Sequence, residues 1–452
     1  MERSLSVAGI GAFQFKMLVL CGGTQFADAL ELILLPFLPK VLLDMEPVGN
    51  PMHVGASSST AWLLSFVVFT GMLIGAPLWG YYSDVHGRRS GMMLSSAFVG
   101  VAGLSSGLAI SIEMLLACRF MVGIGLAGAP CALALFTECL PATRRQDGLV
   151  SFFGMFSVGA IACSLTAWWC IVSLQSWRLL LVFTSIPSLF VVIFSFYSVE
   201  SPLFLVQQGR LDDATKVVDT IMKENGVRID GDDAAQFIDD SVSDIDEPVE
   251  NKLLDKSLVF KLCCLFILMA VVYYSLILLS VSYLGDDKPL MDSGQYIQLC
   301  MVNFAEIPGL VVALYIIKTK DSRYSISILF GICSLFVLLM GLNHIVASGK
   351  LADVLGTIFM FGARASALGF NQSLWIYSSV SFPTHHRTLG IGLVTAAARI
   401  GGLLSPFIGN LLFEQFEFAS LVICTLLCVT CSFISWKCLP PPPFNNSKPG
   451  LA

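Results

Sequence analysis

The most informative stretch of this chain runs Gly80-Tyr-Tyr-Ser-Asp84-Val-His-Gly87-Arg88-Arg89. It joins two apolar runs, one near residues 60–82 and the other near 91–111. Glycine permits a tight turn, and the acid and two arginines can pair with charged groups at neighbouring helix ends. An ordinary loop between two membrane spans needs only the basic residues. The acid and the glycines therefore favour a specific contact at these helix ends.

Those two runs belong to a series of twelve. The chain has 452 residues, 56% hydrophobic and 13% charged, with a mean hydropathy of +0.79. This composition excludes a water-soluble globular fold. Each run can cross the roughly 30 Å hydrocarbon core as a helix, whereas an open strand could not satisfy its backbone in lipid. The runs lie near 16–42, 60–82, 91–111, 114–137, 149–173, 179–198, 258–284, 295–317, 325–347, 352–379, 388–412 and 417–438.

An acidic segment divides the twelve spans six and six. The predicted parts are an N-terminus at 1–15, a six-helix bundle at 16–198, a central loop at 199–257, a second six-helix bundle at 258–438 and a tail at 439–452. In the central loop, apolar residues at helical spacing predict a short amphipathic helix between Asp212 and Gly226. These are Ala214, Val217, Val218, Ile221 and Met222. The acid-rich residues 230–250 predict a disordered linker.

The orientation follows from the charges of the short loops. One set of loops carries eight cations and the other set four, so the positive-inside rule places the first set in the cytoplasm. Both termini and the central loop are then cytoplasmic as well. The first set is Arg88, Arg89, Arg144, Arg145, Lys318, Lys320, Arg323 and Arg387; the second is Lys40, Arg178, Lys288 and Lys350.

The composition also weighs against several functional classes. Fourteen acidic and six basic residues between Leu203 and Lys256 rule out a basic nucleic-acid surface there. The fourteen cysteines lie mostly in apolar runs and are interpreted as buried hydrophobic residues, not as a disulfide frame. The five histidines form no metal-spaced set, and no nucleophile elbow or P-loop is present. We therefore expect no metal, no cofactor, no nucleic acid and no enzyme activity.

The two halves repeat one another. Asp84 aligns with Lys318 at an offset of 234, Arg119 with Arg364 at 245, and Arg145 with Arg387 at 242. Many transporters are built by such internal duplication, with the substrate site between the halves near the middle of the bilayer.

Span four contains Arg119-Phe-Met-Val-Gly123-Ile-Gly125-Leu-Ala-Gly128, which includes a literal G-x-G-x-x-G. A dinucleotide site would need a strand before this motif and a solvent-facing helix start after it, and the sequence predicts neither. Small residues at this spacing let two membrane helices approach closely. Arg119 is the functional candidate, because an arginine at membrane depth usually faces a partner or a cavity.

Further motifs make a resemblance specific. They are Glu138-x-x-Pro141-x-x-x-Arg145, Trp177-Arg178, Val199-Glu200-Ser201-Pro202, Tyr377 to Arg387 followed by Gly390-x-Gly392, Arg399-Ile-Gly401, and Phe13-Gln14-Phe15-Lys16 through Ala27-Asp28-Ala29-Leu30-Glu31. With these residues the chain, from about 13 to 438, resembles the organic-ion and sugar branch of the major facilitator superfamily. Within that branch it is most similar to the synaptic vesicle two-related (SVOP-like) group.

The resemblance implies an all-α membrane protein with the major facilitator fold, which has twelve transmembrane helices in two pseudo-symmetric six-helix bundles. Spans one, four, seven and ten then line a central cavity. A cytoplasmic gate is implied at Gly80, Asp84, Gly87, Arg88, Arg89, Glu138, Arg145 and Arg387.

A polar stripe on span one supplies the candidates for proton or ion coupling. Gln25, Asp28 and Glu31 follow at i, i+3 and i+6, on one face of an apolar helix. Ionised carboxylates there must pair, neutralise or face water. We expect Asp28, and secondarily Glu31, to exchange a proton while a nearby arginine tunes the pKa. The alternative is purely structural pairing with Arg119 or Arg399. Arg119 and Glu306 complete the coupling set.

The remaining polar and aromatic residues of the expected cavity are the substrate candidates, although core packing is the competing role for each aromatic side chain. They are Gln25, Tyr273, Tyr274, Asn303, Arg364, Asn371, Trp375 and Arg399. At membrane depth three acids (Asp28, Glu31, Glu306) balance three arginines (Arg119, Arg364, Arg399). The sum of these charges therefore does not distinguish a cationic from an anionic substrate.

The second half departs from the family pattern. Lys318 stands where the loop motif has its acid, Asp321 where it has a glycine, and Val380 where an acid is expected before Pro383. The position after Glu200-Ser201-Pro202 is Leu203, not the basic residue that is common there. We therefore predict an asymmetric cytoplasmic gate, held mainly by the N-terminal half.

Together these features predict a monomeric secondary-active transporter in a vesicle or plasma membrane. It would carry a small organic solute, with organic ions among the candidates, by alternating access, and protons are the candidate coupling ion. The alternative is a binding or receptor protein of a vesicle membrane that keeps a transporter fold without transporting.

Overall fold

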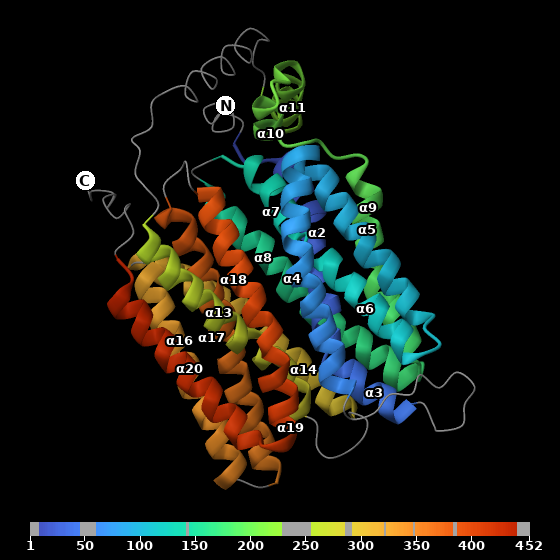
Figure 1. Ribbon diagram of the computed structural model, residues 1–452, viewed down its shortest axis with the longest axis vertical. Coiled ribbons are helices and arrows are strands. Elements are labelled where there is room, and N and C mark those ends of the chain that lie inside the picture. Colours follow the sequence, from blue (N-terminus) through green and yellow to red (C-terminus); the bar gives the residue numbers. More distant parts are fainter. Residues whose placement is uncertain are drawn as a thin grey trace.

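Long helices aligned with one axis fill the molecule (Figure 1). The computed structural model describes residues 9–45, 60–141, 144–227, 255–284, 292–320, 322–346, 349–382 and 387–440. Within these ranges, eleven helical segments are long and apolar enough to cross a membrane. The twelfth membrane-length helix is α5 (Arg88–Gly107), whose 20 residues include five serines and four glycines that lower its hydropathy. The prediction of twelve spans is confirmed.

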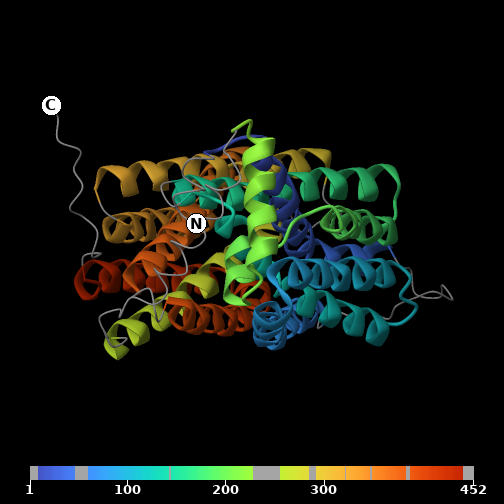
Figure 2. The ribbon, with the colours of Figure 1, turned by 90° about the horizontal axis from the view of Figure 1, so that it is seen from above.

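The N-terminal half consists of α2 (Ala12–Leu34), α3 (Phe37–Met45), α4 (Thr60–His86), α5, α6 (Ile112–Leu126), α7 (Ala129–Glu138), α8 (Arg145–Trp168) with the π-helical turn η2 (Trp169–Ser173), and α9 (Trp177–Ser195). The C-terminal half consists of α13 (Lys256–Leu284), α14 (Ser293–Phe304), α15 (Glu306–Thr319), α16 (Ser322–Val346), α17 (Lys350–Ser381), α18 (Arg387–Pro406), η4 (Phe407–Leu412), α19 (Phe413–Gln415) and α20 (Glu417–Cys438). Seen from above, the two halves lie side by side (Figure 2).

Three spans that the sequence predicts as continuous are broken in the structure. The first divides at Pro36 into α2 and α3, and the fourth divides near Gly128, with Pro130 early in α7. The eighth divides at Ala305, just before α15 begins at Glu306. Proline cannot donate the backbone hydrogen bond that continues a helix, and a proline lies at or shortly after each break: Pro36, Pro130 and Pro308.

The two halves meet on two sides of the molecule. On one side α8 packs against α14 and α15, and on the other side α4 packs against α18. We call these contacts the boundary between the halves. Asn410 of η4 donates to Ser65 of α4 across it, with Nδ2 and Oγ 3.3 Å apart.

The internal repeat is visible as a matching helix crossing in each half. A Cβ added to Gly71 would lie 2.3 Å from the carbonyl oxygen of Phe120, directly after Arg119. A Cβ added to Gly309 would lie 2.0 Å from the carbonyl oxygen of Ala365, directly after Arg364. Only glycine permits this approach of the two backbones. Both arginines therefore occupy the same place in their halves, as their alignment predicts.

The glycines of the G-x-G-x-x-G motif are packing residues. A Cβ on Gly123 would lie 2.2 Å from the carbonyl oxygen of Val68 in α4, and one on Gly125 would lie 2.8 Å from the backbone nitrogen of Val99 in α5. The predicted close approach of helices at this motif is confirmed.

The central loop contributes two helices, α10 (Pro202–Gln207) and α11 (Leu211–Glu224), and α11 lies across one end of the bundle (Figure 2). The predicted amphipathic helix is confirmed, since Ala214, Val217, Val218, Ile221 and Met222 are all buried. Asn225 fixes its end to the start of α2: its Oδ1 accepts from the amide of Phe13 at 3.2 Å, and its Nδ2 donates to Gln14 Oε1 at 2.8 Å. Lys16 and Glu224 add an ion pair of 2.9 Å. The predicted linker at 230–250 lies outside the described residues.

All fourteen cysteines are free, and nine of them are buried. Their interpretation as small buried hydrophobic residues is confirmed for the buried ones.

Candidate functional site

A fully buried ion pair joins the first and fourth spans. Arg119 Nη1 of α6 lies 2.7 Å from Glu31 Oε2 of α2, and both side chains are 0% exposed. Arg119 Nε also donates to Ser106 Oγ at 3.1 Å, and Ser185 Oγ donates to Glu31 Oε1 at 3.3 Å. Every partner belongs to the N-terminal half. Because one charge left alone at this depth would be costly, each side chain serves as the counter-charge of the other.

A second buried ion pair lies in the C-terminal half. Arg364 Nη2 of α17 lies 2.5 Å from Glu306 Oε1 of α15, with exposures of 1% and 0%. Tyr273 packs beneath the guanidinium, its ring centroid 5.9 Å from Arg364 Cζ. Glu306 begins α15, where the helix dipole favours a negative charge.

The second pair, unlike the first, is bonded across the boundary. Ser157 Oγ of α8 donates to Glu306 Oε2 at 3.2 Å. Asn303 Oδ1 accepts from Arg364 Nη2 at 3.2 Å, while its Nδ2 donates to Ser164 Oγ at 2.8 Å and to the carbonyl oxygen of Ala160 at 3.3 Å. Asn303 is therefore placed between Arg364 and α8.

Two charges at membrane depth remain outside these pairs. Asp28 of α2 is half-buried, and no hydrogen bond or ion pair joins it to any residue that the structure describes. Arg399 of α18 is also half-buried; its Nη1 lies 4.0 Å from Met72 Sδ, and its buried Nε has no hydrogen-bond partner in the described chain. Asp28 and Arg399 interact electrostatically.

The other substrate candidates fall into two groups. Tyr273 is buried at 4% exposure and Gln25 at 8%. Tyr274 and Trp375 are half-buried, and each ring contacts another aromatic ring edge to face, Tyr274 with Phe69 and Trp375 with Phe266, both with centroids 4.8 Å apart. Asn371 is half-buried as well, and its Oδ1 has no partner among the described residues.

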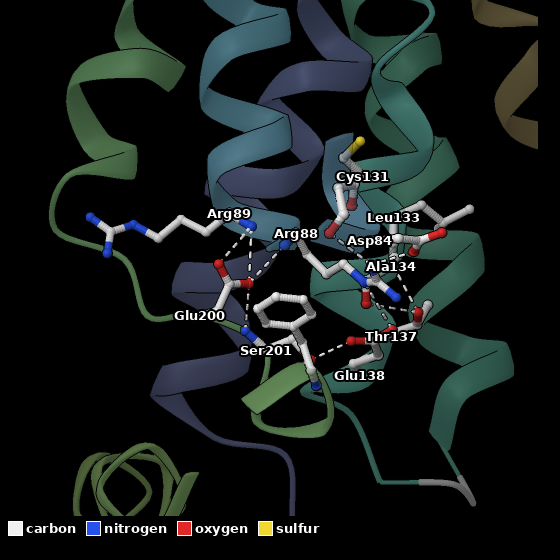
Figure 3. A network of polar contacts seen from close by, with 12 residues as sticks. Asp84, Arg88, Arg89, Cys131, Leu133, Ala134, Thr137, Glu138, Glu200 and Ser201 are labelled. Carbon is white, nitrogen blue, oxygen red and sulfur yellow. Dashed lines mark hydrogen bonds and ion pairs between the residues drawn. The ribbon is translucent and has the colours of Figure 1, made fainter. Parts of the chain in front are cut away.

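Arg88 is the centre of the Gly80–Arg89 cluster (Figure 3). Its Nη1 lies 2.6 Å from Asp84 Oδ1 and 2.9 Å from the carbonyl oxygen of Ser83, and its Nε lies 3.7 Å from Glu138 Oε1. The guanidinium also lies over the ring of Phe204, 5.5 Å from its centroid. One arginine thus ties the end of α4 to α7 and α10.

Glu200 holds the start of α5 (Figure 3). Its Oε1 accepts from the backbone amides of Arg88 and Arg89 at 2.9 and 3.1 Å. These are among the amides that a helix start leaves unpaired, and a carboxylate there also meets a favourable dipole. Gly87 has φ +103°, and a Cβ on it would lie 2.3 Å from Glu200 Oε2. Glycine is therefore required at this turn.

The other predicted gate residues differ in their surroundings. Arg89 donates to the carbonyl oxygens of Ser195 and Phe196 at 2.7 and 2.9 Å, and Arg145 interacts electrostatically with Glu138. A Cβ on Gly80 would meet no atom within 4 Å, so packing does not require glycine there. Arg387 begins α18, but its side chain lies outside the described part of the structure.

Comparison with known proteins decides the family. The model of the family described as "Sugar (and other) transporter" matches residues 37–441. The chain is a member of the sugar (and other) transporter family of the major facilitator superfamily.

The relatives of this transporter span nearly all of it. It is 28% identical to "Organic cation/carnitine transporter 7" of Arabidopsis thaliana over 90% of this chain and 87% of the relative. It is also 28% identical to "Synaptic vesicle 2-related protein" of Xenopus laevis, over 96% and 79%. The inward-open structure of the xylose transporter XylE from E. coli superimposes with a TM-score of 0.76 at 17% identity, over 96% and 97% of the two chains. Another structure of XylE is described as a proton:xylose symporter.

These comparisons confirm the resemblance to the SVOP-like group and the major facilitator fold. The protein is a multi-pass membrane transporter, which confirms the class of protein that the sequence predicts.

Sequence reasoning missed several residues of the transporter's polar clusters. Glu200 and Ser201 belong to a quoted motif, yet their role at the start of α5 and beside Glu138, whose Oε2 accepts from Ser201 Oγ, was not predicted. An acid followed by Ser-Pro is a helix-start signal that could have found them. Ser157 and Ser164 carry no signal in the sequence, because serine is common in apolar spans.

Proposed function

We propose that this transporter moves a small organic solute across the membrane by alternating access of its two halves, and that Glu31 couples the movement to protons. The Glu31–Arg119 pair carries the proposal. It is fully buried, it joins spans one and four, and Arg119 Nη2 has no partner among the described residues.

The physical argument concerns the two protonation states of Glu31. Ionised Glu31 neutralises Arg119, whereas protonated Glu31 leaves the arginine to seek another partner or water. If the site is wetter when it opens to one side than to the other, the two states of the transporter bind the proton with different affinity. A difference in affinity is what shifts a conformational equilibrium. Asp28, the sequence's first candidate for this role, has no equivalent partner in the described chain.

We further propose that both termini are cytoplasmic. The start of α2 contacts α11, and Arg323 Nη1 of α16 donates to the carbonyl oxygen of Leu439 near the end of the chain. The start of α2 thus lies beside the central loop, and the end of the described chain lies beside the basic loop of Arg323; the positive-inside rule assigns both loops to the cytoplasm. The membrane is that of a vesicle or the plasma membrane.

Uptake into proteoliposomes tests the proposal. The screen covers organic cations, organic anions, nicotinate-like acids and sugars, with and without an inward proton gradient. With a transported solute, Glu31→Gln is expected to abolish accumulation driven by the gradient while solute exchange at equal pH continues. Glu113→Gln, which changes an exposed acid at the start of α6, is the matched control.

Two results would overturn parts of the proposal. Gradient-driven accumulation by Glu31→Gln at the rate of the unaltered protein would remove Glu31 from coupling. Tight solute binding by folded protein without any flux would favour the alternative, a membrane binding protein built on the transporter fold.

A further inference from the structure

An apolar crevice opens between the two halves, on the side where α8 packs against α14. Its volume is about 570 Å³, and binding sites for small molecules usually measure roughly 300–1,000 Å³. None of the described residues that line it is charged. Its walls come from α8 of the N-terminal half and from α14 and α17 of the C-terminal half, and they include Ile161, Leu165, Trp168, Tyr296, Phe304 and Phe361.

The crevice occupies one half of the membrane span. In Figure 1, α14 lies at the end of the bundle away from α10 and α11. This helix has 12 residues, which rise roughly 18 Å, about half of the ~30 Å hydrocarbon core. Leu165 and Phe304 are 47% and 52% exposed on the surface of these membrane helices. The molecules that reach the crevice are therefore the lipids of one leaflet.

The hydrogen-bonded boundary between the halves lies directly behind the crevice. Leu165 follows Ser164 in the chain, and Phe304 follows Asn303. Ser164 and Asn303 are buried at 0% and 1% exposure, and their side chains bond at 2.8 Å. A molecule in the crevice would thus contact both halves without disturbing the polar contacts that join them.

A pair of polar groups marks the outer end of the crevice. Trp168 Nε1 donates to Ser293 Oγ at 3.1 Å, where α8 ends and α14 begins. A serine hydroxyl that accepts one hydrogen bond can also donate one. Asp292 precedes Ser293 as the N-cap of α14, so an acid already lies at this end. It would repel the phosphate of a phospholipid, whereas an uncharged hydroxyl can bond to Ser293.

We propose that the crevice binds a membrane sterol, with the sterol hydroxyl at Trp168 and Ser293 and the ring system between α8 and α14. Rigid rings lose less conformational freedom on binding than a flexible acyl chain does, and flat hydrocarbon packs well on the aromatic rings of Phe304 and Phe361. A single hydroxyl at one end of a hydrocarbon body also matches a crevice with one polar end. Because the sterol contacts both halves, it favours the described arrangement of α8 and α14. This site is independent of the proposed transport function.

Photolabelling tests the site. The purified protein, in proteoliposomes of phosphatidylcholine, is irradiated with a cholesterol analogue that carries a diazirine in its ring system, and labelled peptides are identified by mass spectrometry. We expect label in 161–168 and 293–304, and loss of this label when unlabelled cholesterol is in excess. Equally dense label on α9 and α20, whose exposed residues also lie on membrane spans, would overturn the site.

A tryptophan that fills the crevice should displace the sterol. Leu165→Trp is expected to reduce labelling of 293–304 about tenfold, a difference of about 1.4 kcal/mol. Leu342→Trp is the matched control, because Leu342 is 44% exposed near the same end of α16 and does not line the crevice. Thermal unfolding in sterol-free detergent checks that both variants are folded. Equal labelling of the two variants would overturn the inference.

Competition in detergent micelles decides the chemistry of the occupant. Epicholesterol, whose hydroxyl points to the other face of the rings, should displace the label about tenfold less well than cholesterol, and Trp168→Phe should reduce this preference. Both results are ratios within one preparation, so a partial loss of folded protein cancels. Dioleoylphosphatidylglycerol should not compete. Displacement by this phospholipid as effective as by cholesterol would assign the crevice to an acyl chain, and equal competition by the two sterols would overturn the bonded hydroxyl.

Discussion

Lys318 Nζ lies 3.1 Å from Asp147 Oδ1, and this ion pair joins α15 of the C-terminal half to α8 of the N-terminal half. Asp147 also lies 3.4 Å from Arg144 Nη1. In the sequence, Lys318 stands out as the lysine that replaces an expected acid. In the structure, the same lysine pairs with Asp147 of the other half. The residue that makes the two loops differ therefore forms a contact between the halves.

Lys318→Glu is expected to loosen this end of the boundary. The side chains of Lys318 and Asp147 are 60% and 42% exposed, so the pair should contribute no more than about 1 kcal/mol. We expect faster hydrogen exchange at 144–151 and 312–320, measured by mass spectrometry. Lys320→Glu makes the same charge change two residues away and should have little effect. A double variant that swaps the charges, Lys318→Asp with Asp147→Lys, should restore slow hydrogen exchange if the ion pair causes the effect. Fast hydrogen exchange in this double variant would contradict that assignment.

The two glycines of the loop motif should respond in opposite ways to alanine. Gly87→Ala places a side chain at φ +103° and against Glu200, so it should destabilise the protein by about 1–3 kcal/mol. Gly80→Ala meets no atom within 4 Å and lies in α4, where alanine is the better helix former by about 0.5–1 kcal/mol. Thermal unfolding followed by tryptophan fluorescence should show a lower midpoint for the first variant only. A similar fall of the unfolding midpoint in both variants would mean that the contact of Gly87 with Glu200 does not make alanine more harmful there than at Gly80.

Asn303 and Ser164 should prove energetically coupled across the boundary. Their side chains bond at 2.8 Å, and hydrogen bonds between membrane helices contribute about 0.6 kcal/mol on average and up to about 1.7. A double-mutant cycle with Asn303→Leu and Ser164→Ala, measured by unfolding in detergent, should give a coupling in that range. Ser188→Ala is the matched control, because Ser188 is buried in α9 without a hydrogen-bond partner in the described chain. Its effect should simply add to that of Asn303→Leu.

Asn225→Ala should release α11 from the first span. Asn225 bonds both the amide of Phe13 and the side chain of Gln14, and its loss leaves only the exposed Lys16–Glu224 pair among the polar contacts described there. Hydrogen exchange across 211–224 should rise. Thr220→Ala, which alters a half-buried residue whose hydroxyl donates to the carbonyl oxygen of Lys216 within the same helix, should not raise it comparably; equal increases would show that the docking of α11 does not depend on Asn225.

Particular residues show why the fold was predictable to this extent. Hydrophobic runs of membrane length and the repeat that aligns Arg119 with Arg364 are local or periodic signals, and both are confirmed. The buried face of α11 is also a periodic signal, since Ala214 and Val218 repeat at the helical period. The breaks at Pro36, Gly128 and Ala305 were not predicted, because apolar character continues through them and only backbone hydrogen bonding is interrupted.

The sequence by itself determined which charges lie at membrane depth and that they sum to zero. It did not determine their pairing: Glu31 and Arg119 are 88 positions apart in the chain, and contact between spans depends on how twelve helices pack, not on their order. Only the tertiary structure decided that four of the six charges close into two pairs. It therefore also decided that Asp28 and Arg399 lie outside both pairs, because the packing of the helices sets which charges come close enough to pair.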